Sequence, residues 1–206
     1  MPYEFVYKID NTDHVFRCDI PSVQCQAQKK NGRGRCGRVT IIGTPFCYSH
    51  LLSEKKLRIK RSDNPAAGKG LFAQTKGDPN AVVFKKKATI IDYTGDTIDL
   101  DTLNDRYDIA RTNLLTAPYA YEIKKDESYV DSACNRGVAS LVNHKPISKA
   151  NAKFVKTRDA NGEFNGVKLV AQKNIKNNKE IYASYGSTYR MRSRSTHKTT
   201  YKRNRR

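Results

Sequence analysis

The chain has 206 residues and carries 39 Lys and Arg against 20 Asp and Glu, a formal net charge of +19. That length fits one domain with an appendage, and the charge favours nucleic acid, acidic proteins or anionic surfaces as partners. No run approaches the roughly 18 apolar residues of a transmembrane helix, and the first residues lack the apolar stretch of a secretory signal. We therefore expect an intracellular protein, not secreted and without a membrane partner, whose five cysteines are reduced.

The first fifty residues combine a hairpin pattern with metal-ligand residue types. Residues 3–9 and 14–20 are rich in aromatic and β-branched residues around an Asp-Asn-Thr-Asp turn, which predicts a β-hairpin. A Cys-x10-Cys-x10-Cys-x2-His pattern follows, made by Cys25, Cys36, Cys47 and His50. Three thiolates and one imidazole can complete a closed, structural zinc site. The alternatives are buried thiols beside a surface histidine, or a site in which Cys18 displaces Cys25.

This pattern resembles small three-cysteine, one-histidine fingers such as the plant WRC module, from whose spacing it differs by one residue. The segment is also basic, with Lys29, Lys30, Arg33, Arg35 and Arg38. These basic side chains either contact phosphate groups or belong to a solvated loop.

The middle of the chain reads as short strands broken by glycine-rich turns, with one helix expected over 101–110 and capped by Asp99 or Asp101. Strands are expected over 58–61, 71–73, 88–93, 119–123, 128–131, 152–157, 167–172 and 181–184. In residues 135–144, the spacing of Val138, Leu141 and Val142 predicts a helical turn and a half with one buried face. From residue 189 onward the basic residues have no acidic neighbour, which is typical of a disordered tail.

Four motifs stand in a telling order: Gly-Lys-Gly-Leu-Phe-Ala at 68–73, Tyr-Thr-Gly at 93–95, Asn-His at 143–144 and Lys-Glu-Ile-Tyr-Ala-Ser-Tyr-Gly at 179–186. Together they resemble the SET domain of protein lysine methyltransferases, over about residues 57–189. The resemblance implies a mostly β fold with short helices, in which the Asn-His and Tyr-Gly segments interlock as a pseudoknot. The expected organisation is a hairpin and zinc-stapled module over 1–56, the SET domain over 57–189 and a basic tail over 190–206.

The resemblance also implies an activity, the transfer of methyl groups from S-adenosylmethionine to lysine. Tyr185 and Tyr93 would close and line the lysine channel. The expected cofactor-binding residues are Lys69, Gly70, Asn143, His144 and Tyr189. Phe154 and Ala183 would lie at the lysine end of the channel, where neither offers a hydroxyl, so we expect di- or trimethylation. Ser140 and Lys145 depart from the family pattern and should alter the cofactor pocket.

The acidic residues gather in one part of this basic chain. Six aspartates lie within residues 92–108, where Arg106 is the single base, and Asp126, Glu127 and Asp131 follow. We hypothesise an acidic groove for a histone-like tail on a body that contacts DNA or nucleosomes; the alternative is a solvated acidic helix. The compact form resembles viral or bacterial family members more than large chromatin enzymes, and a nuclear, chromatin or virion location is expected. Two other readings stay open: a non-catalytic chromatin-binding or nucleic-acid-binding module on a degenerate SET scaffold, and an architectural protein. The oligomeric state is not predicted.

Overall fold

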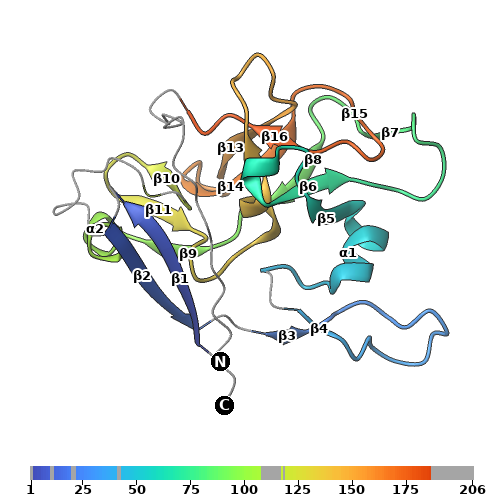
Figure 1. The fold of residues 1–206 in the computed structure, drawn as a ribbon, viewed down its shortest axis with the longest axis horizontal. Coiled ribbons are helices and arrows are strands. Elements are labelled where there is room, and N and C mark those ends of the chain that lie inside the picture. The colour runs from blue at the N-terminus through green and yellow to red at the C-terminus, as the bar shows by residue number, and fades with distance from the viewer. Residues whose placement is uncertain are drawn as a thin grey trace.

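The computed structural model describes residues 2–9, 12–19, 22–40, 43–107, 117 and 119–186. Across these ranges the chain is mostly β, with two short α-helices and two short 3-10 helices (Figure 1). No described helix is both long and apolar enough to cross a membrane. The helical elements are α1 (Tyr48–Lys55), η1 (Pro65–Ala67), α2 (Leu100–Tyr107) and η2 (Val138–Leu141).

A five-stranded sheet forms the centre, in the order β12-β16-β13-β14-β8. Its short strand β16 lies between β12 and β13 and is parallel to both, so the last motif of the chain is threaded between two earlier segments. This threading is the pseudoknot that the family resemblance implied. The strands are β12 (Asn143–His144), β16 (Tyr182–Ala183), β13 (Ala152–Arg158), β14 (Phe164–Ala171) and β8 (Thr89–Asp92).

Smaller sheets surround this centre. A three-stranded sheet has the order β10-β11-β9, and the remaining sheets are two-stranded pairs. The three strands are β10 (Ala120–Lys124), β11 (Ser128–Asp131) and β9 (Asp96–Ile98). The pairs are β1 (Pro2–Ile9) with β2 (Thr12–Asp19), β3 (Val23–Gln24) with β4 (Val39–Thr40), β5 (Leu57–Arg61) with β6 (Lys69–Ala73), and β7 (Val82–Phe84) with β15 (Ile175–Lys176).

The main apolar core lies between the central sheet and the β5–β6 pair. It includes Leu71, Leu169 and Ile181, all fully buried, and also Leu51 from α1. Residues 51–60 contain the end of α1 and the start of β5, and the buried Leu51 packs with the core beside the central sheet. Lys56 takes a left-handed backbone conformation that ends α1 and leads directly into β5. The division of the chain at residue 56 stays a prediction.

The N-terminal hairpin β1–β2 is confirmed, and Figure 1 shows it near β9, β11 and α2. A disulfide between Cys18 and Cys134 joins the hairpin to the chain that follows β11. The expectation of five reduced cysteines is therefore wrong for these two. Cys18 is bonded to Cys134, so it cannot replace Cys25 in the metal cluster.

The predicted helix is found as α2, and Asp99 caps it: the Asp99 carboxylate accepts a hydrogen bond from the Thr102 N–H at 2.8 Å. Its expected last residues, 108–110, lie outside the described residues, as do Tyr189 and the basic tail. In the opening part of the Asn-His segment, Val138 and Val142 are buried as expected, around one 3-10 turn rather than an α-helical one.

Candidate active site and metal cluster

A small aromatic pocket of about 50 Å³ lies between β10, β13 and the Asn-His segment. Tyr93, Phe154 and Tyr185 line it, as the family resemblance implied for a lysine channel. The remaining lining residues are Ala120, Tyr121, Ala139, Ser140 and Val142. Ala183 does not line it and is fully buried in the main core.

Tyr121 is a pocket residue that the sequence reasoning missed. Residues 119–123 were read as a strand, but the position of Tyr121 in it carries no signal of its own until β10 is placed beside β13. In the structure the Tyr121 ring lies against the Phe154 ring, with centroids 5.7 Å apart, and Tyr93 meets the same ring edge-on at 5.3 Å. Three aromatic rings therefore form a continuous wall.

The tyrosines of this wall are held neutral. Burial raises the pKa of Tyr93 far above its ordinary value, and burial also raises the pKa of Tyr121. The Tyr93 hydroxyl donates to the Tyr119 carbonyl at 2.7 Å, so this ring has a fixed orientation. A lysine that enters this pocket loses its water, and the loss of water disfavours the charged ammonium form relative to the neutral amine. The neutral amine is the form of lysine that can act as a nucleophile.

Tyr185 stands where the pocket meets the pseudoknot. Its hydroxyl donates to the Val142 carbonyl at 2.5 Å, and its backbone N–H donates to Nδ1 of His144 at 3.1 Å. The two rings lie 5.2 Å apart. Partial burial lowers the pKa of His144, and the neutral ring is the form that can accept this hydrogen bond at Nδ1. The interlocked strands thus bring Tyr185 and His144 together although 41 residues separate them.

The expected cofactor-binding residues also assemble at one place. The Asn143 amide donates to the Lys69 carbonyl at 3.1 Å and to the Glu180 carboxylate at 2.8 Å. Gly70 adjoins the same group: a Cβ built there would lie 2.1 Å from a Glu180 oxygen. The structure therefore joins Lys69, Gly70, Asn143 and His144 beside Tyr185, while Tyr189 lies outside the described residues.

Glu180 is a second residue whose role the sequence reasoning missed, although it lies within a quoted motif. It is only 2% exposed, and its carboxylate accepts hydrogen bonds from the Ser62 hydroxyl, the Asp63 N–H, the Asn143 amide and the Tyr182 hydroxyl. Burial would raise the pKa of Glu180, but these hydrogen bonds outweigh burial and hold the pKa below its ordinary value. A buried, ionised carboxylate thus fixes the Asn143 side chain.

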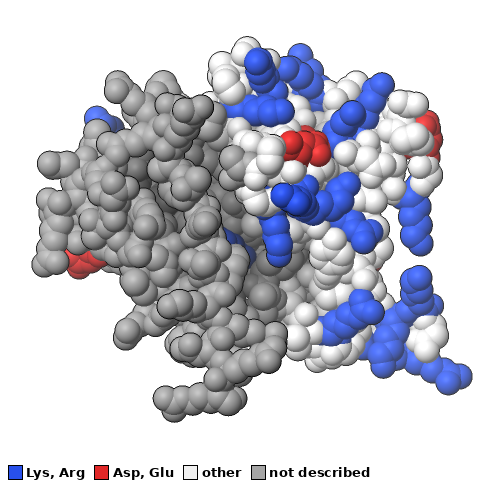
Figure 2. All heavy atoms as spheres, viewed as in Figure 1, with Lys and Arg blue, Asp and Glu red and all other residues white. Residues whose placement is uncertain are grey.

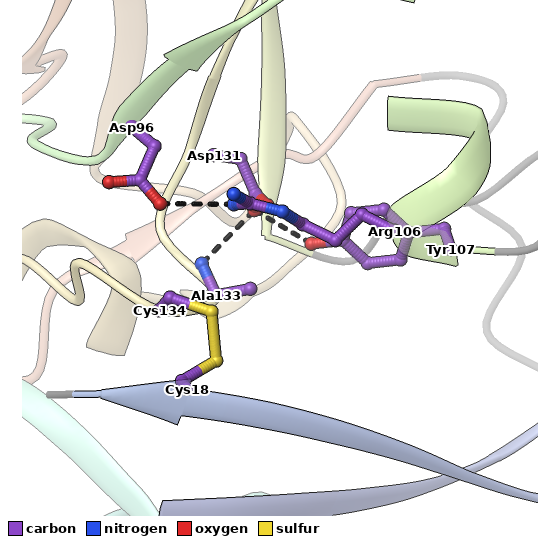
Figure 3. Close-up of a disulfide and its surroundings, with 7 residues drawn as sticks. All are labelled: Cys18, Asp96, Arg106, Tyr107, Asp131, Ala133 and Cys134. Atoms are coloured by element: carbon purple, nitrogen blue, oxygen red, sulfur yellow. Dashed lines mark hydrogen bonds and ion pairs between the residues drawn. A yellow bond between two sulfur atoms is a disulfide. The ribbon is translucent and has the colours of Figure 1, made fainter. Parts of the chain in front are cut away.

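The acidic segment proves to be partly structural. Asp131 is fully buried and binds Arg106 at 2.7 Å, the Tyr107 hydroxyl at 2.7 Å and the Ala133 N–H at 3.0 Å (Figure 3). Asp96 shares the same arginine at 3.1 Å. These contacts remove Asp131 from any peptide groove, because its carboxylate is enclosed. The exposed acids that remain near β10 and α2 are Asp92, Asp99, Asp101, Asp105, Asp126 and Glu127.

The predicted metal ligands come together. The ligand atoms of Cys25, Cys36, Cys47 and His50 all lie within 4.8 Å of one another. The distances from His50 Nδ1 to the Cys25 and Cys47 sulfurs are 3.4 and 3.3 Å, close to the ligand–ligand separation of about 3.5 Å in tetrahedral zinc sites. Burial by itself would raise the pKa of Cys47. The N–H groups of His50 and Ser49 and nearby side chains outweigh this effect and lower the pKa to about 6. This donor set fits zinc, and Cys25 fills the position for which Cys18 was the alternative.

On the part of the face in Figure 2 that is not grey, Lys and Arg side chains are numerous, from the region of β3 and β4 up past α1 and β5. Residues 22–61 contain ten Lys or Arg and one acidic residue, Glu54. Lys29, Lys30 and Arg33 are exposed, and none forms an ion pair with a described residue. Exposed acids also occur outside β8–β11 and α2, at Glu54, Asp63, Asp78, Asp159 and Glu163, so the acidic groove stays a hypothesis.

Comparisons with known proteins agree with this geometry. The SET-domain profile matches residues 68–186, more than half of the chain. A structure of ctPRC2 with bound histone H3 ligands and a structure of an active polycomb repressive complex 2 each align at 24% identity and a TM-score of 0.51, covering 65% of this chain. A further structure of the Chaetomium thermophilum complex aligns at 23% identity and a TM-score of 0.50, covering 66%.

The alignments span only 15–16% of those longer chains, and at these identities they establish the fold alone. No curated protein sequence matches significantly. The matched profile includes all four motifs, the threaded strand and the pocket tyrosines. The chain therefore belongs to the SET-domain family.

Proposed function

We propose that the protein is an S-adenosylmethionine-dependent protein lysine N-methyltransferase. The observation that carries this proposal is the aromatic pocket, which shares Tyr185 with the cluster of Asn143, His144, Lys69 and Gly70. One end can admit a lysine side chain, and the other can hold the methyl donor. A non-catalytic binding module on a degenerate scaffold would not need both the aromatic pocket and the cluster around Asn143 and His144.

The chain's own residues supply positioning and desolvation. When bound, S-adenosylmethionine would supply a methyl group on a sulfonium sulfur; the N–C bond to a neutral lysine amine would form as the C–S bond breaks, with S-adenosylhomocysteine as the leaving group. Tyr93, Tyr121 and Phe154 exclude water and so favour the neutral amine. The Val142 carbonyl and the Tyr185 hydroxyl lie at the junction of the two halves, where oxygens can orient the methyl group by weak C–H···O contacts. The alignment of the reacting atoms is the main catalytic contribution that this arrangement offers.

The decisive test is transfer of a tritiated methyl group from S-adenosylmethionine to free histones and to nucleosomes. We expect incorporation by the wild type and a loss of about 100-fold or more in Tyr185→Phe, the size of effect seen when one oriented polar group is removed. Glu163→Gln, an exposed residue paired with Lys124, is the control and should keep full activity. Failure of the wild type to bind S-adenosylmethionine in calorimetry would favour the binding-module alternative.

The product is proposed to be a di- or trimethylated lysine. Phe154 lines the pocket and has no hydroxyl that could hold a water against the methylated amine. Phe154→Tyr should therefore shift the final product toward monomethyl-lysine, as measured by mass spectrometry of a peptide treated to completion. If the wild type itself stopped at monomethyl-lysine, this part of the proposal would be wrong.

The substrate is proposed to be a histone-like basic tail. Tyr121 lines the pocket from β10, and β10 pairs with β11, which pairs with β9, so the exposed acids of this sheet and of α2 lie on the side from which a basic peptide would approach. Asp101→Lys with Asp105→Lys should raise the peptide KM with little change in kcat. An unchanged KM would reduce the acidic residues to a solvated helix face.

Nucleic acid is the proposed second partner, in keeping with a nuclear or chromatin location. The exposed tip of the finger presents Lys29, Lys30 and Arg33, and polyanions bind such clusters with a strong salt dependence. Changing these three residues to Ser should weaken duplex DNA binding in fluorescence anisotropy and flatten its salt dependence. The control carries the same charge change at Lys85, Lys86 and Lys125, and equal weakening there would deny the finger a specific role.

A further inference from the structure

Residues 43–46, which precede the metal ligand Cys47 and which we call the strap, contact the site at Gly43. The Gly43 N–H donates to the Arg136 carbonyl at 2.5 Å, and the Gly43 carbonyl accepts from the Thr94 hydroxyl at 3.0 Å. Both polar backbone groups of Gly43 are therefore engaged. Thr94 belongs to the Tyr-Thr-Gly motif, and Arg136 belongs to the segment that leads to Asn143.

The backbones of Gly43 and Gly137 pack closely against each other and against Thr94. A Cβ built on Gly137 would lie 2.0 Å from the Thr94 hydroxyl oxygen, closer than real Cβ atoms come, so this position requires glycine. A Cβ built on Gly43 would lie 3.0 Å from the Gly137 backbone and 3.0 Å from the Thr94 hydroxyl oxygen, which is tighter than nine in ten real Cβ contacts. A side chain at Gly43 would therefore push these neighbours apart by a few tenths of an ångström.

The contact lies directly beside the pocket. Gly137 precedes the 3-10 turn η2, which begins at Val138, and the Ser140 N–H donates to the Gly137 carbonyl at 3.2 Å. Ala139, Ser140 and Val142 then line the pocket. A displacement of the strap would therefore act on the start of the turn that forms one pocket wall.

The strap leads directly into the metal cluster. Its last residue, Phe46, adjoins the ligand Cys47, and within the finger the Gln26 N–H donates to the Pro45 carbonyl at 2.8 Å. The buried neighbours of the ligands in the finger are few: the apolar cluster there consists of Cys25, Ala27, Cys36 and Cys47, with Phe46 packed against it. The position of Gly43 thus depends on the cluster that holds Cys47 in place.

We propose that the finger is a positioning element for the methyltransferase site, and that Gly43 couples occupancy of the metal cluster to affinity for S-adenosylmethionine. This rests on the proposed function in that it assigns the cofactor to the Asn-His segment. Coupling of this kind is reciprocal, so the cofactor must raise the affinity of the cluster for its metal by the same factor by which the metal raises the affinity for the cofactor. Gly43, Thr94 and Gly137 act through the turn and are positioning residues.

The test compares Gly43→Ala with Gly37→Ala, whose added Cβ would meet nothing within 4 Å. We expect Gly43→Ala to keep one zinc per chain but to bind S-adenosylmethionine about fivefold or more weakly in calorimetry, while Gly37→Ala matches the wild type. Hydrogen exchange of the Ser140 and Val142 amides should also quicken in Gly43→Ala. Thr94→Val should reproduce these changes and Thr94→Ser should restore wild-type behaviour, which keeps the test valid if Gly43→Ala does not fold.

The reciprocal measurement follows zinc transfer to a chromophoric chelator with and without S-adenosylmethionine. At equilibrium the cofactor should reduce the fraction of zinc that the wild type gives up to the chelator, and it should lose this effect in Gly43→Ala. Unchanged cofactor affinity and unchanged amide exchange in both Gly43→Ala and Thr94→Val would overturn the proposal. If the wild type bound no S-adenosylmethionine while exchange still quickened in the variants, the positioning contact would stand and the proposed function would fail.

Discussion

The finger and the SET core of this protein are stabilised in different ways. The SET core buries a large apolar cluster that includes Leu51, Leu71, Leu169 and Ile181. The buried apolar cluster of the finger consists almost wholly of its own metal ligands. A segment that small cannot bury enough apolar surface to fold without a staple. We propose that a metal held by these ligands stabilises the finger, whereas apolar packing stabilises the SET core, with the strap joining the two regions.

Removing the metal should have the largest effect and should separate the two regions. Metal binding in small Cys/His sites contributes roughly 10–16 kcal/mol, so chelation or Cys47→Ser should unfold the finger. Hydrogen-exchange mass spectrometry should show lost protection at the Cys25 and Cys36 amides, which bond to Arg38 and Ala27, while the β13–β14 pair stays protected. Cys134→Ser, outside the cluster, should retain the metal. Loss of protection in β13–β14 to the same extent would mean that the two regions fold as one.

Truncating the apolar core should have the next largest effect, with the opposite distribution. Leu169 is fully buried in the centre of the main sheet, and Leu169→Ala should lower the free energy of unfolding by about 2–5 kcal/mol because it leaves a cavity. Zinc content should not change. Denaturant unfolding and metal analysis of the same sample make the comparison, and zinc loss in the folded variant would contradict it.

These two regions also differ in how far the sequence could predict them. The four residues of the metal cluster were predicted, with Cys18 as an alternative to Cys25, because cysteine and histidine at metal-ligand spacing carry their chemistry in their identity. The pocket tyrosines Tyr93 and Tyr185 were found through motifs. Tyr121 and Glu180 were not, because each gains its role from segments far away in the chain: Phe154 for Tyr121, and Ser62 and Asn143 for Glu180.

Most strands were predicted within a few residues, since alternation and turn residues are local signals. Two features that the sequence did not predict have non-local causes: the disulfide and the packing of Leu51 in the main core. The disulfide depends on the hairpin bringing Cys18 to Cys134, which lies 116 residues away. The burial of Leu51 in the main core depends on the packing of α1 against β5. A short, weakly amphipathic helix carries no local sequence pattern that predicts this contact.

A substitution of the buried Glu180 tests whether hydrogen bonds stabilise the site in addition to apolar packing. Glu180→Gln keeps the shape but loses the charge that four donors stabilise, and it should cost about 1–3 kcal/mol of stability at neutral pH and weaken cofactor binding through Asn143. The folded-state pKa of Glu180 is lowered, so its stabilisation is present above its ordinary pKa and is lost as the pH falls through the lower folded value. The difference from wild type should therefore shrink below about pH 4.3.

Denaturant unfolding at a series of pH values measures this difference. Glu163→Gln, an exposed residue paired with Lys124, is the control and should change stability by less than about 0.5 kcal/mol. If the two variants behaved alike at neutral pH, the hydrogen-bond network around Glu180 would contribute little.

The smallest expected effect is a pH dependence of cofactor binding that arises at His144. Its pKa is lowered, so the neutral ring that accepts the Tyr185 N–H persists above the ordinary value of about 6.5 and is lost as the pH falls through the lower folded value. Affinity for S-adenosylmethionine should stay constant from about pH 7 to 8 and decline below pH 6. His144→Asn, which keeps an acceptor that does not titrate, should abolish this decline in calorimetry. A decline of equal size in the variant would assign it to another group.

The central claim is that the threaded strand brings a lysine pocket and a cofactor site together at Tyr185. A crystal structure with S-adenosylhomocysteine and a lysine-containing histone peptide tests it most directly. The account predicts the cofactor product beside Asn143, His144 and the Lys69–Gly70 backbone, with the lysine side chain between Tyr93, Tyr121 and Phe154. A cofactor bound elsewhere, or a peptide lysine that leaves this pocket empty, would contradict it.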